Sequence, residues 1–106
     1  MKAVFWTSTA NQDLVEIPDY LAEESIEAAE AFVNGVDELL AHLAEFPQIG
    51  RVVPELERQN VTRFRELVLS PWRIVYREEE DKIFVITVFD GRRNIEDILL
   101  RRMLRE

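Results

Sequence analysis

The sequence predicts an α+β fold in which a helical hairpin and a C-terminal helix surround a small, mainly antiparallel sheet. Two consecutive segments of the N-terminal half carry apolar residues at helical spacing. Three short segments rich in β-branched and aromatic residues follow, with only short turns between them. The chain has 106 residues, which is enough for one compact domain but too few for two. Residues 1–106 are therefore expected to form a single domain with the element order β-α-α-β-β-β-α.

The N-terminal half is predicted to contain one strand and two helices. Residues 2–7, KAVFWT, alternate weakly and are rich in residue types that favour strands. Residues 8–17 follow with apolar side chains at helical spacing, and Pro18 is expected to kink this first helix without ending it. Ser25 is expected to cap a second, longer helix. The apolar stripe of this second helix comprises Ile26, Ala29, Phe32, Val33, Val36, Leu39, Leu40 and Leu43.

The C-terminal half is predicted to contain three strands and one helix. Residues 51–60 are expected to be a connector, because Pro54 disfavours a central strand. The turns SP and EEED separate the next three segments and predict an antiparallel meander. The three predicted strands are residues 63–69, 72–77 and 82–89. The last of them is apolar on both faces, which predicts a central strand, and Asn94 is expected to cap a C-terminal helix.

Side chains alternate across a strand, and this predicts which residues share a face of the sheet. Trp72, Ile74 and Tyr76 are expected on one face, with Arg73 on the other. In the last strand, strict alternation groups Phe89 with Ile83, Val85 and Thr87. The helices are expected to cover one face and to leave the other partly open.

Charge is distributed unevenly along the chain. The net charge of −8 argues by itself against a nucleic-acid-binding protein. Residues 1–57 contain two basic and twelve acidic side chains, whereas residues 58–106 contain eleven basic and nine acidic ones. This asymmetry indicates either a local basic surface on an acidic body or solvated arginines that offset nearby acids.

Arginines occupy unusual places in the predicted sheet. Arg73 lies in the middle of a strand, so it is expected to face solvent or to meet a carboxylate such as Glu66. Arg92 and Arg93 follow a DG pair where the chain leaves the sheet. Together these arginines could build a basic cluster on the open face or at its rim.

Several classes of site are disfavoured by composition. The chain has no cysteine and His42 is its one histidine, so no metal site and no disulfide are expected. No glycine-rich phosphate loop, pair of catalytic carboxylates or Ser/His/Asp set is visible, and no cofactor is expected. The longest apolar run, residues 83–89, is too short to cross a bilayer, and the N-terminus lacks the apolar core of a signal peptide. A cytoplasmic protein without membrane contact is therefore expected.

Four segments, in order, resemble the RelE/ParE superfamily of bacterial toxins from type II toxin–antitoxin modules, also known as plasmid stabilisation proteins. They are FWTSTANQDLVEI, FPQIGRVVPE, RFRELVLSPWRIVYR and ITVFDGRR, and they span nearly the whole chain. The resemblance implies a growth-inhibiting toxin that is neutralised by a co-expressed cognate antitoxin, in a toxin–antitoxin hetero-oligomer. RelE-like members cleave messenger RNA on the ribosome, whereas ParE-like members poison DNA gyrase.

The resemblance also assigns candidate site residues. Arg73 matches the RelE-type arginine of the strand, and Arg92 or Arg93 matches the arginine after the last strand. The two RelE-type lysines fall near Phe64 and Glu66 and are missing here, and the nearest basic residue is Arg65. The RelE-type tyrosine of the last helix falls near Leu99, and no Tyr or His follows Tyr76.

The incomplete nuclease set favours the ParE-like branch. RNA cleavage through the 2′-OH needs a base, an acid and cations for the developing charge. Arg73 and Arg92 could be those cations and Glu66 is the one nearby base candidate, but no acid is evident. An acidic body also suits a phosphate-rich ribosome poorly. A gyrase-binding inhibitor is therefore favoured over two alternatives: a ribosome-dependent mRNA endoribonuclease, and an inactive toxin-fold subunit that only binds antitoxin. The candidate site residues are Arg73, Arg92, Arg93, Arg65 and Glu66.

Overall fold

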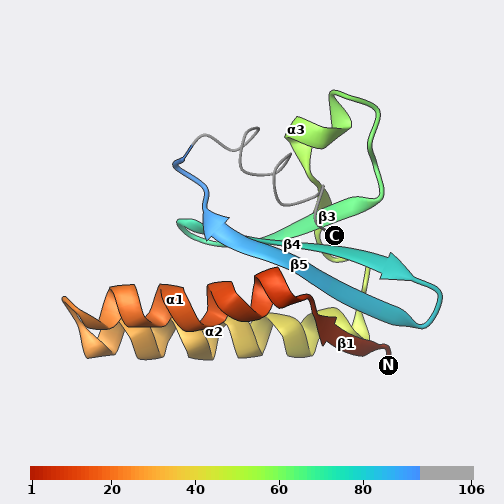
Figure 1. Cartoon of the computed structure of the whole chain (residues 1–106). Coiled ribbons are helices and arrows are strands. Elements are labelled where there is room, and N and C mark those ends of the chain that lie inside the picture. Colours follow the sequence, from red (N-terminus) through yellow and green to blue (C-terminus); the bar gives the residue numbers. More distant parts are fainter. Residues whose placement is uncertain (94–106) are drawn as a thin grey trace.

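The computed structural model of the chain describes residues 1–93. The predicted C-terminal helix therefore lies outside the described residues. The described part forms β1 (Ala3–Trp6), α1 (Ser8–Ala22), α2 (Ile26–Glu45), β2 (Arg51–Val52), α3 (Pro54–Glu57), β3 (Phe64–Leu69), β4 (Trp72–Glu79) and β5 (Lys82–Asp90) (Figure 1). Within residues 1–93, no helix is both long enough and apolar enough to span a membrane.

The strands form one five-stranded sheet in the order β1-β5-β4-β3-β2. The predicted antiparallel meander of β3, β4 and β5 is confirmed. Strand β1 extends the sheet by pairing in parallel with β5, from Ala3 opposite Lys82 to Trp6 opposite Val85. Strand β5 has a neighbouring strand on each side, which confirms its predicted central position, and its apolar residues contribute to a core on each face of the sheet.

Residues 51–60 contain a short strand and a short helix. The prediction that this segment is only a connector was therefore wrong. Arg51 and Val52 pair with Glu66 and Arg65 as the edge strand β2. Pro54 then starts the short helix α3. Proline suits this position because the first helical residues need no N–H partner and its fixed φ matches a helix. Pro54 thus stays out of the strand, as expected, but it begins a helix and not a loop.

The two long helices start where side chains can cap them. The Thr7 hydroxyl accepts a hydrogen bond from the Ala10 N–H at 3.2 Å and donates to the Ile86 carbonyl at 2.8 Å, which joins the start of α1 to β5. The predicted cap of α2 is confirmed, because the Ser25 hydroxyl accepts from the Ala28 N–H at 3.1 Å. Helix α1 continues through Pro18, so this proline does not end it.

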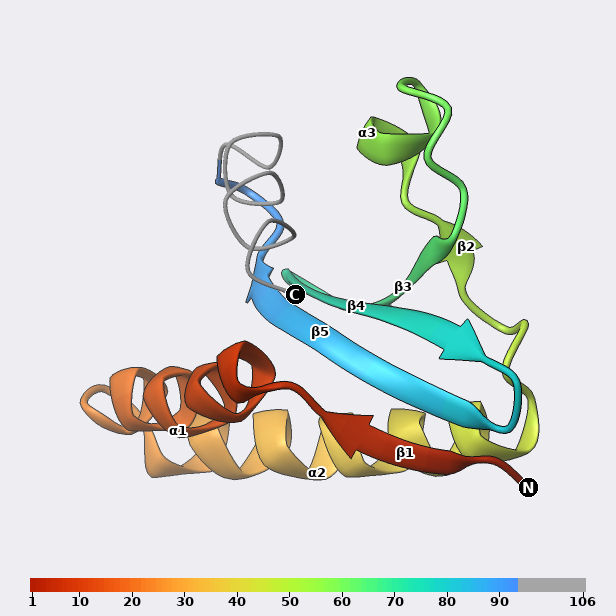
Figure 2. The same cartoon turned by 45° about the vertical axis from the view of Figure 1, so that its right-hand side comes forward.

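The helical hairpin packs on one face of the sheet and builds the main core. Figure 2 shows α1 and α2 side by side beneath the strands. Phe32, Val36 and Leu43 of the predicted α2 stripe are buried there. Ile26 and Val33 are not buried but are 69% and 40% exposed. The hairpin extends past the end of the sheet (Figures 1 and 2). The sheet is therefore too short to cover the whole apolar stripe of α2.

A second, smaller core lies on the other face of the sheet. Val53, Leu56, Phe64, Val75, Ile86 and Phe89 form it. Helix α3 contributes Leu56 to this core and so covers part of the face that was expected to be partly open.

A register shift in β5 changes which residues face this second core. Val75 pairs with Thr87 whereas Tyr76 pairs with Val85, so Ile86 is the extra residue of a bulge. An extra residue reverses the alternation beyond it. Phe89 consequently packs in the second core, and its predicted grouping with Ile83 and Val85 was wrong.

Candidate functional site

Arg73 is held between two carboxylates on the α3 side of the sheet. Its Nη1 and Nη2 donate to the two carboxylate oxygens of Glu55 at 2.9 and 2.8 Å. Its Nε donates to Oε1 of Glu66 at 2.7 Å, which confirms the predicted pairing with Glu66. Arg73 is only 6% exposed, and its guanidinium carbon lies 5.5 Å from the centre of the Phe89 ring. The guanidinium is therefore neutralised inside the protein and does not face solvent.

Strand register and α3 together place these charges. Glu66 lies opposite Arg51 in the β2–β3 pair, and Arg51 Nε donates to its Oε2 at 2.7 Å. The result is an alternating ion chain, Glu55–Arg73–Glu66–Arg51, with two negative and two positive members. The hydrogen bonds from Arg73 lower the pKa of the Glu55 carboxyl. Hydrogen bonding to Glu55, and then to Glu66, raises the pKa of Arg73. We refer to these four residues as the ion chain.

The ion chain predicts acid sensitivity. Because the folded-state pKa of Glu55 lies below its ordinary value of 4.5, its contribution to stability is present above that pH and is lost as the pH falls through the lowered pKa. Below pH 4.5, wild-type protein is expected to lose urea resistance more steeply than Glu55→Gln, which has no carboxylate to protonate. Urea unfolding from neutral pH to about pH 3 measures this difference. Equal slopes for the two proteins would contradict the prediction.

Arg92 and Arg93 lie at the rim of the sheet, where the chain leaves β5. The Arg92 guanidinium pairs with the Asp90 carboxylate, with Nη2 at 2.6 Å from Oδ2, and lowers the pKa of that carboxyl. Both arginines are exposed. The turn lies against Arg73, since a Cβ on Gly91 would come 2.7 Å from the Arg73 Cδ. The structure thus brings Arg73 and Arg92 into one region, but each is paired with a carboxylate, so they form no free basic cluster.

Arg65 belongs neither to the ion chain nor to the arginines at the rim of the sheet, Arg92 and Arg93. Its Nη1 donates to the Gly50 carbonyl at 2.7 Å. By alternation along β3 its side chain lies on the face opposite to Glu66. Of the candidate residues, the structure therefore joins Glu66 to Arg73, places Arg92 and Arg93 nearby at the rim, and separates Arg65. Within residues 1–93, no group of three or more His, Asp or Glu side chains is arranged to hold a metal ion.

Sequence reasoning missed a row of aromatic and basic side chains that crosses four strands. Phe5 of β1 pairs with Phe84 of β5, which pairs with Arg77 of β4, which pairs with Phe64 of β3. The Phe5 and Phe84 rings stack at 5.7 Å, and the Arg77 guanidinium lies 4.8 Å from the Phe84 ring centre. Phe5 remains 44% exposed at the sheet edge. Only the parallel β1–β5 pairing brings Phe5 to this row, and no local pattern in the sequence predicts that pairing.

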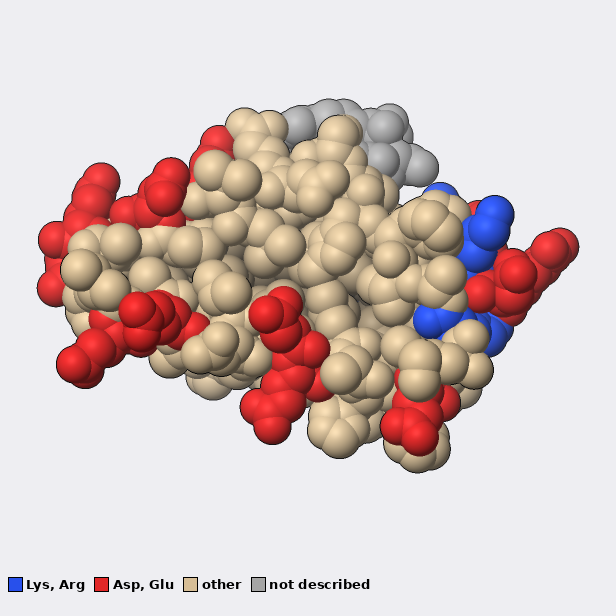
Figure 3. All heavy atoms as spheres, turned by 90° about the horizontal axis from the view of Figure 1, so that it is seen from below, with Lys and Arg blue, Asp and Glu red and all other residues tan. Residues whose placement is uncertain are grey.

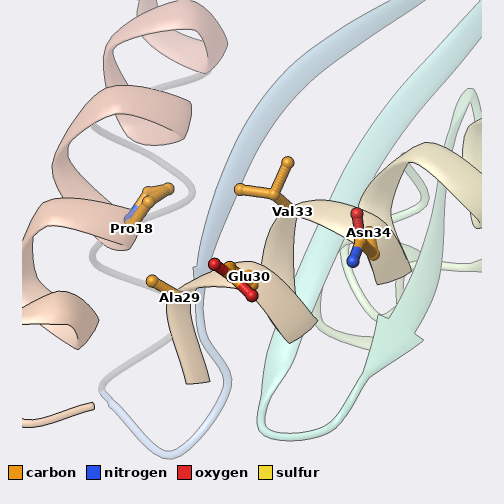
Figure 4. A pocket seen from close by; sticks show the side chains of 5 residues that line it. All are labelled: Pro18, Ala29, Glu30, Val33 and Asn34. Atoms are coloured by element: carbon orange, nitrogen blue, oxygen red, sulfur yellow. The ribbon is translucent and has the colours of Figure 1, made fainter. Parts of the chain in front are cut away.

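The hairpin carries a second exposed surface that sequence reasoning did not single out. A hollow of about 340 Å³ opens between α1 and α2 and is lined by Pro18, Ala29, Glu30, Val33 and Asn34. Figure 4 shows Pro18 on one helix and Ala29 and Val33 on the other. Among the described residues seen in Figure 3, Asp and Glu groups are spread over the surface with uncharged atoms between them, and Lys and Arg gather at one edge.

Comparison with known proteins identifies the family. Residues 4–95 match the family model described as the ParE toxin of type II toxin–antitoxin system, parDE. The chain belongs to the ParE toxin family. The predicted membership of the RelE/ParE superfamily is thereby confirmed, and this ParE-family chain is the toxin of a type II toxin–antitoxin system.

Individual relatives agree with this family. Toxin ParE3 of Caulobacter vibrioides is 25% identical over 96 residues, which cover 90% of this chain and 92% of that toxin. A structure titled as a chromosomal ParDE toxin–antitoxin system from P. aeruginosa has a TM-score of 0.58 at 22% identity, over 85% of this chain and 96% of that chain. The toxin–antitoxin complex RelBE2 from Mycobacterium tuberculosis has a TM-score of 0.53 at 20% identity, over 84% and 90%. These structures share the fold of this ParE-family chain.

Proposed function

We propose that this ParE-family toxin inhibits growth by binding DNA gyrase, without nuclease chemistry of its own, and that a co-expressed antitoxin neutralises it. The observation that carries the proposal is the state of Arg73. A cation that stabilises a phosphorane must be free to approach phosphate oxygens. Here the guanidinium is buried between Glu55 and Glu66, whose negative charges would repel a phosphate.

The general base and general acid that a nuclease needs also lack suitable side chains among the described residues near Arg73. Glu66 accepts charge-assisted hydrogen bonds from both Arg51 and Arg73, one at each carboxylate oxygen, so both oxygens are committed to structural partners. The Tyr76 hydroxyl accepts from the Gly50 N–H and donates to the Pro47 carbonyl, so it is committed to structural contacts. A binding inhibitor needs none of these chemical groups, which supports the ParE-like mode of action.

Exposed apolar side chains support the antitoxin partner. Phe5 on the sheet and Val15, Ile26 and Val33 on the hairpin are each at least 40% exposed. A protein that is stored in an inactive complex can keep such groups covered until the partner is removed. The solved relatives are titled as toxin–antitoxin systems, which supports the same expectation for this chain.

Two activities measured on the same purified protein test the proposal. With gyrase, the toxin is expected to inhibit supercoiling and to raise the level of cleavage complexes, and added antitoxin is expected to reverse both effects. With ribosomes programmed with messenger RNA, no toxin-dependent cleavage is expected. Message cleavage without an effect on gyrase would replace the proposal by the endoribonuclease alternative. Antitoxin binding with neither effect would indicate an inactive toxin-fold subunit.

In cells, the order of events after induction separates the same alternatives. Pulse-labelled protein synthesis is expected to continue in the first minutes after the toxin is induced without antitoxin, with filamentation and later arrest. An immediate collapse of synthesis before any DNA damage would contradict gyrase as the target.

An Arg92→Ala variant is the informative substitution for this experiment. Arg92 is exposed and pairs with its neighbour Asp90, so its replacement leaves the ion chain intact.

A further inference from the structure

We propose that a hollow between α1 and the end of β5 receives an arginine side chain of DNA gyrase. This inference rests on the proposed inhibition of gyrase by this toxin. The hollow has a volume of about 340 Å³, and we call it the α1–β5 hollow. Its lining includes Asp13, Glu16 and Tyr20 of α1, Trp72 of β4, Asp90 of β5, and Arg93.

One side of α1 and the end of the sheet form the walls of the α1–β5 hollow. Asp13, Glu16 and Tyr20 occupy positions i, i+3 and i+7 of the helix, so they lie on the same side of it. Helix α1 packs against β5, and Figures 1 and 2 show the end of β5 above this helix. The two walls are therefore held together by the fold of the toxin.

Asp13 provides a carboxylate in a fixed position. It is only 5% exposed. Its Oδ2 accepts hydrogen bonds from the Thr87 hydroxyl at 2.8 Å and from the Val88 N–H at 2.9 Å. These donors belong to β5 and hold the carboxylate against the strand. A charged group that is already ordered loses little conformational entropy when a ligand binds beside it.

Two aromatic side chains give the α1–β5 hollow the features of a guanidinium site. Tyr20 is 67% exposed on α1, and Trp72 starts β4 opposite Asp90. The Trp72 ring is held by an edge-to-face contact with Phe32, with 5.4 Å between the ring centres. A planar guanidinium can stack on aromatic rings while its N–H groups donate to carboxylates, which an ammonium group does less well.

Charge favours a cation over an anion in this hollow. The carboxylates of Asp13, Glu16 and Asp90 line it together with one guanidinium, that of Arg93. The neighbouring Arg92 is paired with Asp90. Helix α1 also belongs to residues 3–50, which contain ten Asp and Glu residues and no Lys or Arg. A positively charged side chain is therefore attracted to this side of the toxin, and a phosphate group is repelled.

The same argument favours gyrase as the source of the arginine. An enzyme that acts on DNA must present basic side chains, because these neutralise the DNA phosphates. Tyrosine, tryptophan and arginine are also the residue types that contribute most to binding at protein interfaces. A hollow with Tyr20 and Trp72 beside carboxylates complements such an arginine in both shape and charge.

Small probes test the chemistry of the hollow without gyrase. N-acetylarginine amide is expected to shift the NMR signal of the Trp72 indole N–H in the full-length toxin. N-acetylcitrulline amide, which has the same shape but no charge, is expected to leave that signal unchanged. Trp6 is an internal control because it packs against the main core. A Trp72 signal that does not respond to the arginine probe, or responds equally to both probes, would overturn the proposal.

Inhibition of gyrase tests the occupant. Glu16→Lys and Tyr20→Ala change exposed side chains of the hollow. Each is expected to raise the toxin concentration for half-inhibition of supercoiling about tenfold. The matched controls are Glu38→Lys, exposed on α2, and Phe46→Ala, which is 57% exposed just after α2. Both controls are expected to inhibit like the wild type, and thermal unfolding shows that all four variants keep the fold.

Two results of this experiment would overturn the proposal. Undiminished inhibition by Glu16→Lys and Tyr20→Ala would show that gyrase does not use the hollow. An equal loss in Glu16→Lys and Glu38→Lys would show that overall negative charge attracts gyrase and that the hollow has no special part in binding.

The outcomes also separate this inference from the proposed function. A wild-type toxin without any effect on gyrase would contradict the proposed function and exclude gyrase as the occupant. Inhibition by the wild type and by all variants would keep the proposed function and overturn the hollow alone. Weaker antitoxin binding by Glu16→Lys and Tyr20→Ala, with normal inhibition of gyrase, would assign the hollow to the antitoxin and overturn gyrase as its occupant.

Discussion

Replacing Arg73 by alanine is expected to destabilise the fold by about 3–5 kcal/mol. Arg73 is 6% exposed and Glu66 is 1% exposed. Removing the guanidinium leaves the Glu66 carboxylate buried beside a single cation, Arg51, and takes the partner away from Glu55. An uncompensated buried charge costs far more than the net value of the ion pair. Urea unfolding at neutral pH, compared with the wild type, measures the loss.

Two further variants show whether the loss comes from an unpaired charge. Arg73→Met combined with Glu66→Leu is expected to recover much of the stability, since apolar residues of similar volume can replace a buried ion pair. Arg92→Ala, at an exposed position, is expected to leave the urea midpoint unchanged. An Arg73→Ala protein as stable as the wild type would contradict the structural role of Arg73. If the prediction holds, loss of toxicity in that variant reports unfolding and is no evidence for catalysis.

Replacing Gly50 by alanine is expected to cost about 1–3 kcal/mol, because no space exists for a methyl group. A Cβ at this position would lie 2.5 Å from the Tyr76 hydroxyl oxygen and 2.7 Å from the backbone carbonyl oxygen of Glu66. The Gly50 N–H also donates to the Tyr76 hydroxyl at 3.0 Å, and that hydroxyl donates to the Pro47 carbonyl at 2.9 Å. The methyl group would therefore push apart the contact between the α2–β2 connection and β4. Urea or thermal unfolding measures the effect.

Gly35→Ala is the matched control for this substitution. A Cβ at Gly35 would meet only the side chain of Leu69, whose methyl groups lie 2.9 Å away and can rotate. Gly35 lies inside α2, where alanine is favoured over glycine by about 0.5–1 kcal/mol. Gly35→Ala is therefore expected to be neutral or stabilising. Adding Tyr76→Phe to Gly50→Ala should restore only part of the stability, since the Glu66 carbonyl still blocks the methyl group. Equal effects of the two glycine substitutions would contradict this account.

One part of the candidate site was predictable from the sequence, namely the carboxylate partner of Arg73. A guanidinium in the middle of a strand is costly to bury alone, so a carboxylate partner for Arg73 followed from the sequence, and Glu66 is that partner. Glu55 was not predicted, because the segment around Pro54 has no periodicity that would reveal a helix of four residues. Glu55 is important because it accepts two further hydrogen bonds from the Arg73 guanidinium and helps to keep this group buried.

Local interactions explain why much of the fold was predictable from sequence alone. The cap at Ser25, the apolar spacing of α2 and the short turns of the meander each depend on residues close together in the chain. The free energies of capping, helical burial and tight-turn pairing are set by such neighbours. The hairpin, the antiparallel meander and the order of β1, α1, α2, β3, β4 and β5 therefore follow from the sequence, whereas β2 and α3 do not.

Tertiary structure alone decided the features that join distant segments. The parallel pairing of β1 with β5, the bulge at Ile86 and the placing of Glu55 on Arg73 each depend on packing between residues far apart in the chain. The bulge moved Phe89 to the second core, and the length of the hairpin left Ile26 and Val33 uncovered. The sequence by itself determined which side chains are apolar or charged on each element. Long-range packing, which no local pattern encodes, determined which of them are neutralised inside the protein and which remain exposed for a partner.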